Sequence, residues 1–310
     1  MVVSVLLPVY NAGFPLAQAI ESILNQDLAA FELLIIDDAS TDSSAQTIRN
    51  YAAQDPRIKA IFHSQNVGLA NTLNEGLQLA TYDFVARMDQ DDESLPNRLR
   101  VQFDYLNANP DVMVLGSFVY HMGAKPEFDR LIELPIAPAD IKAVLTKYNC
   151  MYHPSVMLRR KEILELGGYR SQFKNAEDYD LWLRVSKVHI LANVPVPLLR
   201  YRFSVTGMTL SRKWEQLFYV YLALAAFEDE ASPLEELKER ATTMLKQMDQ
   251  TYFLTQVAKG TVKDLISLRL WKDALAVAFR FSKDIGAWRS LALLLNKLVS
   301  RFSSVTERIG

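Results

Sequence analysis

Three aspartates in the first third of the chain stand close enough in sequence to act on one ligand. Asp89, Asp91 and Asp92 follow the apolar run 82–85 and are followed by Pro96. Carboxylates held close together repel one another and raise one another's pKa, so a cluster without a partner is costly. Aspartate oxygens are ligands that Mg²⁺ and Mn²⁺ prefer, and Mg²⁺ is usually held by one or two carboxylates together with substrate phosphates. The cluster therefore suggests a metal-assisted diphosphate site, with a solvated acidic turn as the alternative.

The elements that would position this cluster can be read from hydrophobic spacing. Four apolar runs predict buried strands: 2–7, 31–36, 58–62 and 82–88. Three segments with helical spacing or cap-type residues lie between them: 15–27, 40–54 and 68–80. Strands that alternate with such helices predict a parallel, doubly wound α/β sheet, in which ligands bind at the carboxyl ends of the strands. This rule brings to one edge the aspartates and the residues that end the other strands: Pro8, Val9, Tyr10, Asn11, Asp37, Asp38 and Asn66.

The rest of the chain is less regular. The pattern predicts a helix over 96–109, a strand over 112–120 and a loop over 123–138 that could cover a substrate. After this loop it predicts a strand over 153–158 with a helix after it to 168, and a helix over 175–187 with Leu181, Trp182 and Val185 facing inward. Two closing strands are predicted over 188–194 and 197–203. From Trp214 onward the pattern is wholly helical, with breaks at Pro233 and Gly260. We therefore expect an α/β domain over residues 1–210, with halves 1–95 and 96–210, and a helical region over 211–310.

Composition narrows the class of protein. The net charge of −2 and the lack of a dense basic stretch argue against a nucleic-acid partner. The single cysteine, Cys150, excludes an internal disulfide and a cysteine zinc site, and it fits a reducing compartment. The apolar start is too short for a signal peptide, and no run approaches the ~18 apolar residues of a membrane span. These features predict a cytoplasmic protein, or one attached to a membrane surface.

Five segments occur in an order and spacing that carry a family resemblance. They are 4–11, 35–42, 66–74, 87–92 and 177–182, with the sequences SVLLPVYN, IIDDASTD, NVGLANTLN, RMDQDD and EDYDLW. Together they resemble the nucleotide-sugar glycosyltransferases of family 2, which have the GT-A fold. The resemblance covers about residues 2–203 and implies that 1–95 binds the nucleotide-sugar and 96–210 the acceptor. The C-terminal third matches nothing specific.

The resemblance implies a role for each residue at the strand ends. Pro8, Val9, Tyr10 and Asn11 would shape the nucleoside pocket, and Asp38 would accept a hydrogen bond from the base or ribose. The alternative for Asp38 is that it caps the helix after it.

Further along, the resemblance implies a donor-binding turn and an acidic metal site. Asn66, Gly68 and Asn71 would fix a turn near the donor, with helix capping as the alternative for Gly68. Asp91 would bind Mn²⁺ or Mg²⁺ directly, and Asp89 would contact the ribose or metal-bound water. The remaining donor-binding residues implied are Arg87, Gln90, Asp92 and His153. Arg87 would pair with the cluster or with a phosphate, and a structural ion pair is the alternative.

Asp178 is implied to be the general base. In an inverting single displacement it would take the proton of the acceptor hydroxyl while that oxygen attacks C1 of the sugar. The leaving diphosphate needs no protonation, so the two-carboxylate scheme of glycosidases does not apply. Glu177 is the neighbour that could share the role. Acidic residues that complement the helix dipole are the alternative for both.

The chain departs from the family pattern at one position. Members often end the domain with Tyr-Arg-x-His, in which the histidine completes the metal site, but here Ser204 follows Tyr201, Arg202 and Phe203. A hydroxyl is a poorer ligand, so the ion would keep an extra water or bind only with the donor. His153 could substitute, or it could be structural or a donor to substrate oxygens. The departure also leaves open a catalytically silent homologue that binds nucleotides or glycans.

The resemblance suggests transfer of one hexose or N-acetylhexosamine, with UDP as the leading nucleotide, to a glycan or lipid-linked acceptor. A processive synthase is disfavoured because the chain lacks a Gln-x-x-Arg-Trp motif. A dinucleotide-binding oxidoreductase or a nucleotidyltransferase would want a glycine-rich loop after the first strand, which is absent here. The helix expected over 287–302 has a broad apolar face, which would pack on the catalytic domain, on a second subunit or on a membrane surface.

Overall fold

The computed structural model of the protein describes residues 2–202, 210–270 and 272–278. The strands are β1 Val3–Val9, β2 Phe31–Asp37, β3 Ile58–Phe62, β4 Phe84–Arg87, β5 Glu93–Ser94, β6 Val112–His121, β7 Arg130–Ile132, β8 Met157–Arg159 and β9 Ile190–Tyr201. The helices are α1 Pro15–Leu24, α2 Ser44–Ala52, α3 Leu69–Leu79, α4 Arg98–Ala108, α5 Pro138–Leu145, α6 Arg160–Glu165, α7 Glu177–Val188, α8 Leu210–Glu228, α9 Leu234–Lys246 and α10 Gln250–Ser267. Two 3₁₀ turns are η1 Pro126–Phe128 and η2 His153–Ser155. Phe203, Ser204 and the helix expected over 287–302 lie outside the described residues.

The strands form one mixed sheet in the order β3-β2-β1-β4-β8-β6-β9-β5, with β7 paired to β6. The first half, β3-β2-β1-β4, is parallel throughout, as its alternation with α1, α2 and α3 predicted. β8 enters antiparallel between β4 and β6, and β9 lies parallel to β6. The parallel strands carry their carboxyl ends to the same edge of the sheet, which is where the predicted site residues stand.

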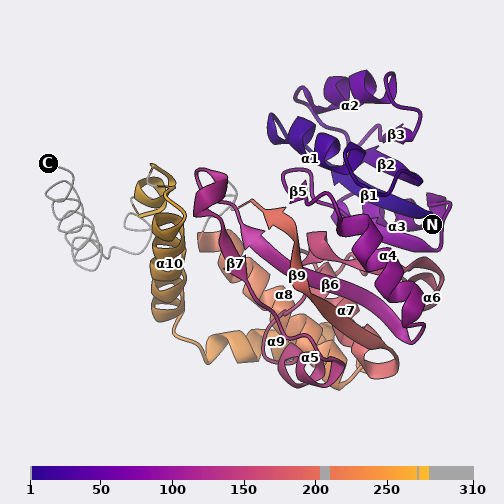
Figure 1. Ribbon diagram of the computed structural model, residues 1–310. Coiled ribbons are helices and arrows are strands. Elements are labelled where there is room, and N and C mark those ends of the chain that lie inside the picture. The colour runs from indigo at the N-terminus through magenta and orange to yellow at the C-terminus, as the bar shows by residue number, and fades with distance from the viewer. Residues whose placement is uncertain (1, 203–209, 271, 279–310) are drawn as a thin grey trace, which may run out of the picture.

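Both faces of the sheet are covered, so neighbouring residues of a strand enter different cores. In β1, Leu6 packs with α3, α6 and α7, whereas Val5 and Leu7 pack with α1, α2 and α4. Because successive side chains of a strand point to opposite faces, a strand buried on both faces reads as a continuous apolar run. This explains why β1 and β2 carry apolar runs, and it confirms the doubly wound architecture (Figure 1).

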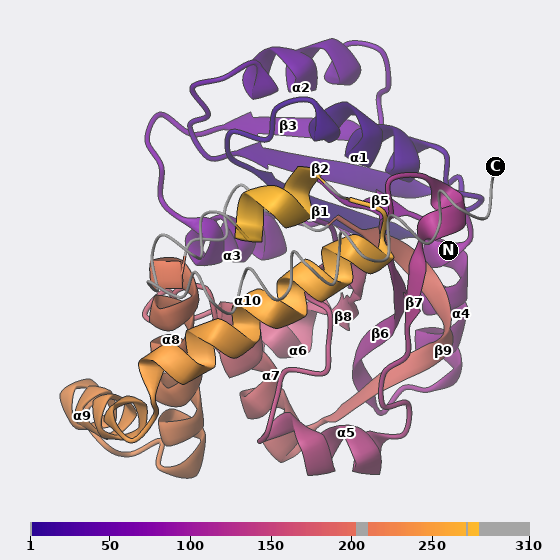
Figure 2. The same ribbon diagram turned by 90° about the vertical axis from the view of Figure 1, so that its left-hand side faces the viewer.

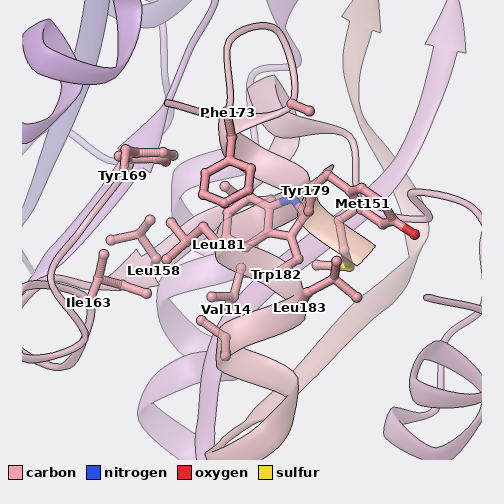
Figure 3. Close-up of a cluster of buried hydrophobic side chains, with 14 of the residues drawn as sticks. Val114, Met151, Leu158, Ile163, Tyr169, Phe173, Tyr179, Leu181, Trp182 and Leu183 are labelled. Carbon is pink, nitrogen blue, oxygen red and sulfur yellow. The ribbon is translucent and has the colours of Figure 1, made fainter. Parts of the chain in front are cut away.

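Helix α7 carries the predicted acidic motif at its start and anchors it through its buried face. Leu181, Trp182 and Val185 are buried completely, which confirms their predicted inward orientation. Figure 3 shows Trp182 at the centre of this cluster, with Tyr179 and Met151 beside it. A helix packed this way has little freedom to shift, so the carboxylates in its first turn are held in place from below.

Three expectations for the second half of the domain were wrong. The expected strands over 188–194 and 197–203 are one strand, β9, because register shifts opposite Ser117 and Phe118 let it pass its prolines without ending. The expected loop over 123–138 contains η1 and β7, with α5 starting at its end. The expected strand over 153–158 begins as the turn η2, because Pro154 cannot donate to a strand ladder.

The C-terminal helices pack in two different places. Helices α8 and α9 share the core of α7, whereas α10 forms a small third core with Trp214 and the helical residues 272–278. Pro233 lies in the expected break, directly before α9, but Gly260 lies inside α10 and does not break it. Figure 2 shows α10 crossing the molecule from α9 towards β7. Among the described residues, no helix is both long and apolar enough to span a bilayer.

Candidate active site

A pocket of about 490 Å³ lies at the carboxyl ends of β1, β2 and β4. It brings together most residues predicted to contact a donor or metal: Pro8, Val9, Tyr10, Asp38, Asn66, Gly68, Asp89, Gln90 and Asp91. Four predicted residues do not line it: Asn11, Asn71, Arg87 and Asp92. His153 is also outside the lining, in the buried layer beneath it.

The loops around this pocket are tied to one another by side chains. Gln90 accepts a hydrogen bond from the Tyr10 backbone N–H at 2.7 Å and donates to the Tyr10 carbonyl at 3.1 Å. Asn11 has a left-handed φ of 50°, its N–H donates to the Ser40 hydroxyl, and its side-chain oxygen accepts from the Thr41 N–H. Gln90 and Asn11 therefore join the loops after β4, β1 and β2 into one wall.

Asp38 holds the start of α3 rather than capping the helix after it. Its two carboxylate oxygens accept the N–H groups of Val67 and Gly68 at 2.8 and 2.9 Å. His63 contacts the same carboxylate at 2.8 Å and Glu75 at 2.8 Å. Burial acts against charge on His63, but these two carboxylates outweigh it and raise its pKa. The alternative that Asp38 caps the helix after β2 is wrong, and its carboxylate stands in the pocket wall already oriented by α3.

The acidic cluster is compact and lies beside two arginines. Oxygens of Asp89, Asp91 and Asp92 lie within 4.8 Å of one another. Arg87 is buried and forms an ion pair of 2.5 Å with Asp89. Asp92 is almost fully buried and accepts the backbone N–H of Arg202 at 2.7 Å, so it fixes the loop after β9 from behind the pocket.

These carboxylates fit a divalent cation. Burial and the charge of Asp89 raise the pKa of Asp91 to about 6, and burial raises that of Asp92 well above its usual range. One Asp92 oxygen, Oδ2, is buried without a hydrogen-bond partner in the described structure. A cluster that is short of positive charge in this way is what a hard cation with oxygen ligands would stabilise. Asp91 and Asp89 face the pocket and are the two residues placed to hold one.

The predicted base lies at the start of α7. Asp178 Oδ2 accepts a hydrogen bond from the Asn149 amide at 2.8 Å, and Asn149 Oδ1 accepts the Met151 N–H at 3.1 Å. Because that N–H can only donate, the orientation of the Asn149 amide is fixed. Burial raises the pKa of Asp178, and burial followed by the charge of Asp178 raises that of Glu177 to about 7.

Arg87 is the charge that both acidic groups share. Burial raises the pKa of Asp91, Glu177 and Asp178, and the positive charge of Arg87 offsets part of that rise in all three. Burial, with a smaller contribution from the Arg87 charge, lowers the pKa of His153 and keeps it neutral. His153 Nε2 bonds to the Tyr169 hydroxyl at 2.9 Å, and its ring meets Trp182, so it supports the floor of the site. The two acidic groups therefore lie within electrostatic reach of one buried cation.

Sequence reasoning missed six residues of this site. Leu69, Thr72, Tyr201 and Arg202 line the pocket of about 490 Å³, which is called the donor pocket below after the role predicted for its residues. His63 and Asn149 hold Asp38 and Asp178. Tyr201 and Arg202 could have been predicted by the rule of strand ends, because they lie at the carboxyl end of a strand, as the predicted residues do. For Asn149 there was no such signal, since its contact with Asp178 joins segments 29 residues apart.

The chain is similar to known proteins over most of this region. Residues 4–167 match the family described as Glycosyl transferase family 2. The amylovoran biosynthesis glycosyltransferase AmsE of Erwinia amylovora is 32% identical over 230 residues, which cover 71% of this chain and 86% of AmsE. The Escherichia coli enzyme named UDP-Gal:alpha-D-GlcNAc-diphosphoundecaprenol beta-1,3-galactosyltransferase is 31% identical over 183 residues, 58% of this chain and 66% of that protein.

Solved structures share the fold at low sequence identity. TarS residues 1–349 of S. aureus, in complex with UDP-GlcNAc, has a TM-score of 0.59 at 14% identity and covers 96% of this chain, with 92% of its own length matched. The mannosyltransferase PcManGT of Pyrobaculum calidifontis, in complex with GDP-Man and Mn²⁺, has a TM-score of 0.57 at 17% identity. It covers 97% of this chain, with 80% of its own length matched. These likenesses confirm the predicted GT-A fold.

Proposed function

The chain belongs to glycosyl transferase family 2 and uses a nucleotide-sugar; we propose that it moves one hexose or N-acetylhexosamine from a UDP-sugar to a hydroxyl of a glycan or lipid-linked acceptor. The observation that carries the proposal is a pocket at the carboxyl ends of the strands that contains the acidic cluster, with Asp178 at the start of α7 within the electrostatic range of the same arginine, Arg87. UDP is favoured because one relative's name and one solved complex contain UDP-sugars. A lipid-linked acceptor is favoured because that relative's name specifies a diphosphoundecaprenol.

In the proposed mechanism, Asp178 is the base of an inverting single displacement. The acceptor oxygen forms its bond to C1 of the sugar while the bond from C1 to the diphosphate oxygen breaks. The hydroxyl proton passes to Asp178, and the Asn149 amide holds the receiving carboxylate in orientation. Base catalysis of this kind typically contributes ~10²–10⁴-fold.

The leaving diphosphate would be held by the cluster side of the pocket. Arg202 lines the pocket, and its Nε donates to the Asp91 carbonyl at 2.7 Å while its Nη2 donates to Gln18 at 2.9 Å. Its guanidinium would supply positive charge to a phosphate bound there. Mn²⁺ or Mg²⁺, bound through Asp91 and Asp89, would stabilise the negative charge that develops on the leaving group. Because Ser204 is a weak ligand, we expect the ion to bind tightly only together with the donor.

A donor panel tests the proposal. The protein is incubated with UDP-, GDP- and dTDP-sugars plus Mn²⁺, and the release of free nucleotide is measured with and without acceptor. We expect release from at least one UDP-sugar, and Asp178→Asn should lower kcat by about 10²–10⁴ while the donor still binds. Retained UDP binding without turnover of any donor would instead identify the silent homologue. Normal turnover in Asp178→Asn would exclude Asp178 as the base.

The metal site has its own test. Calorimetry compares UDP binding with and without Mn²⁺ in the wild type and in Asp91→Ala. We expect Mn²⁺ to strengthen UDP binding in the wild type and to have little effect in the variant, because one of the two carboxylates of the acidic cluster that line the pocket is gone. Thr243→Ala, an exposed change in α9, is the control. An unchanged metal dependence in Asp91→Ala would contradict the assignment.

A further inference from the structure

His63 stands behind the wall of the donor pocket, between two carboxylates. It follows β3 directly, and its side chain is only 11% exposed. Its Nδ1 lies 2.8 Å from Asp38 Oδ1, and its Nε2 lies 2.8 Å from Glu75 Oε2. An ionised carboxylate only accepts hydrogen bonds, and a neutral imidazole has one donor nitrogen and one acceptor nitrogen. The ring therefore donates to both carboxylates only as the charged imidazolium, with a proton on each nitrogen.

The charged groups around His63 are mostly acidic. At the end of β2 stand Asp38 and Asp37, and the carbonyl of Asp37 accepts the His63 backbone N–H at 2.9 Å. Glu75 comes from α3, and from α2 the Arg49 guanidinium lies 4.5 Å from the centre of the aromatic ring that precedes His63. Burial lowers the pKa of His63, but Asp38 and Glu75 outweigh it and raise the pKa above the ordinary 6.5. The ring therefore keeps its proton to a higher pH than a free histidine does.

The His63 proton acts on the side chain of Asp38 and not on its backbone. The Asp38 N–H donates to the Val9 carbonyl at 2.7 Å, and the Asp38 carbonyl accepts the Asn66 amide at 3.2 Å. The carboxylate accepts two backbone N–H groups at the start of α3 and a third bond from His63. Because a carboxylate has about four acceptor sites, about one remains for a ligand in the donor pocket, which Asp38 lines.

Loss of the His63 proton disturbs this arrangement in two ways. One of the two carboxylates then faces a ring nitrogen that no longer donates. The Asp38 carboxylate, in a residue that is only 4% exposed, also loses the cation that compensates its charge, which is costly for a buried group. Both changes favour movement of the carboxylate out of its place in the wall.

We therefore propose that His63 is a positioning residue: its charged ring holds the Asp38 carboxylate in place for the nucleotide, and nucleotide binding weakens when the ring loses its proton. The inference rests on the proposed function, in which this pocket binds the nucleotide of the donor. Binding is then strongest below the pKa of His63 and falls as pH rises through it. Because such coupling is reciprocal, a bound nucleotide must in turn raise the pKa of His63.

Two substitutions of His63 separate its two hydrogen bonds. The amide nitrogen of asparagine takes roughly the place of Nδ1, so His63→Asn keeps a neutral donor for Asp38. The amide nitrogen of glutamine takes roughly the place of Nε2, so His63→Gln keeps a donor for Glu75 alone. Glu75→Gln, at a 40% exposed side chain outside the donor pocket, leaves Asp38 intact and lowers the pKa of His63. His189→Gln, directly after α7, is the control for loss of a histidine.

Calorimetry measures the binding of UDP with Mg²⁺ at pH 6 and pH 9. Between these values we expect the affinity of the wild type to fall about tenfold more than that of His63→Asn. At pH 6 we expect His63→Gln to bind UDP about tenfold more weakly than His63→Asn. Asp91, with a pKa of about 6, and the phosphates of UDP titrate in wild type and variants alike, so only the differences between them report on His63.

NMR titration of the His63 ring, with and without UDP, measures its pKa directly. We expect UDP to raise this pKa in the wild type, and we expect the fall in affinity to move to lower pH in Glu75→Gln. Equal pH dependence in the wild type and His63→Asn, or a His63 pKa that UDP leaves unchanged, overturns the inference.

The same experiments distinguish failure of the inference from failure of the proposed function. If neither UDP nor GDP nor dTDP binds the wild type at either pH, the proposed function fails. The backbone amide signals of Val67 and Gly68, which Asp38 holds, still decide whether His63 positions that carboxylate. They should follow the His63 titration in the wild type and lose this pH dependence in His63→Asn, and signals that ignore the titration overturn the inference.

Discussion

Arg87 shows how one residue sets the charge of the whole site. Its side chain ends β4 and is only 2% exposed, so its charge would be costly without partners. Asp89 provides a direct ion pair, and Asp91, Glu177 and Asp178 lie within reach of its field. The sequence left two alternatives for Arg87, a structural ion pair and a contact with the acidic cluster or a phosphate of the donor. The structure confirms the ion pair, and a contact with phosphate stays a prediction.

Glu177 should make the stability of the protein depend on pH. Its pKa is raised to about 7 in the folded state from 4.5 in the unfolded chain, so the folded state binds more protons between these values. Stability from this group is therefore present at low pH and is lost as pH rises from about 4.5 to 7. We expect Glu177→Gln to be more stable than the wild type by about 1–3 kcal/mol at pH 8 and equally stable near pH 4.5.

Urea unfolding of both proteins at pH 4.5, 6 and 8 measures this difference. Glu162→Gln, at a partly exposed position in the first turn of α6, controls for the loss of one negative charge near a helix start. A difference between Glu177→Gln and wild type that is the same at all three pH values would contradict the raised pKa.

At the scale of elements, α3 is the helix that connects the donor pocket with the rest of the site. Its start is fixed by Asp38 from β2, and its first turn lines the donor pocket. Gly68, the residue before it, has φ 87° and ψ 155°, a backbone region that essentially only glycine adopts. Capping and a turn near the donor were alternatives for Gly68, and the structure combines them, because this residue starts the helix and lines the pocket.

Gly68→Ala should therefore destabilise the fold, and a second glycine supplies the matched control. An added Cβ at Gly68 meets no atom within 4 Å, so the expected cost of about 1–3 kcal/mol is one of backbone conformation alone. Gly260 lies inside α10 with equally free space, and Gly260→Ala should stabilise by about 0.5–1 kcal/mol. Urea unfolding gives both values. Equal effects of the two substitutions would show that the positive φ is not what requires glycine at 68.

At the scale of the whole molecule, a chain of contacts joins the C-terminal helices to the donor pocket. Asp264 of α10 pairs with Arg130 of β7 at 2.7 Å, and Arg130 donates to His121 Nδ1 at 3.3 Å. Burial, together with the Arg130 charge, lowers the pKa of His121 to about 4, so it is neutral and its Nε2–H donates to the Tyr152 hydroxyl at 2.8 Å. The Tyr152 ring packs edge-on against Tyr201 in the pocket wall. The position of α10 is thus linked to the donor pocket through packed side chains.

Asp264→Ala should loosen α10 without unfolding the protein. The ion pair is about one-third exposed on both sides, so it is screened and should contribute about 0.2–1 kcal/mol. We expect faster amide hydrogen exchange, by up to about fivefold, in α10 and in residues 124–132, measured by mass spectrometry. Lys263→Ala, an exposed neighbour without an ion pair among the described residues, is the control. Identical exchange in the two variants would exclude Arg130 as the anchor of α10.

The domain boundary at residue 210 also belongs to this scale. The described residues after 210 form the helices α8, α9 and α10 and the helical segment 272–278, and α8 and α9 share the core of α7. The division into 1–95, 96–210 and 211–310 therefore stays a prediction, as do a membrane contact or homodimer through the C-terminal helices and a cytoplasmic location.

The sequence by itself determined the features that depend on local patterns. Alternating apolar runs and helical spacing defined the parallel half of the sheet, and the rule of strand ends then selected most of the predicted residues that line the donor pocket. This succeeded because the period of a strand or helix is set within a few residues. The same local view misjudged β9, where two prolines suggested an end but a change of register against β6 allowed the strand to continue.

Only the tertiary structure decided which polar groups meet. Asp92 accepts from Arg202 across 110 residues of chain, Asn149 holds Asp178, and Asp38 holds α3 instead of the helix after it. Such pairs depend on strand order, register and the packing of helices on the sheet, and no local period encodes them. The composition of the site could thus be predicted from the ends of strands, whereas the partner of each charge, and hence its pKa, was fixed by the fold.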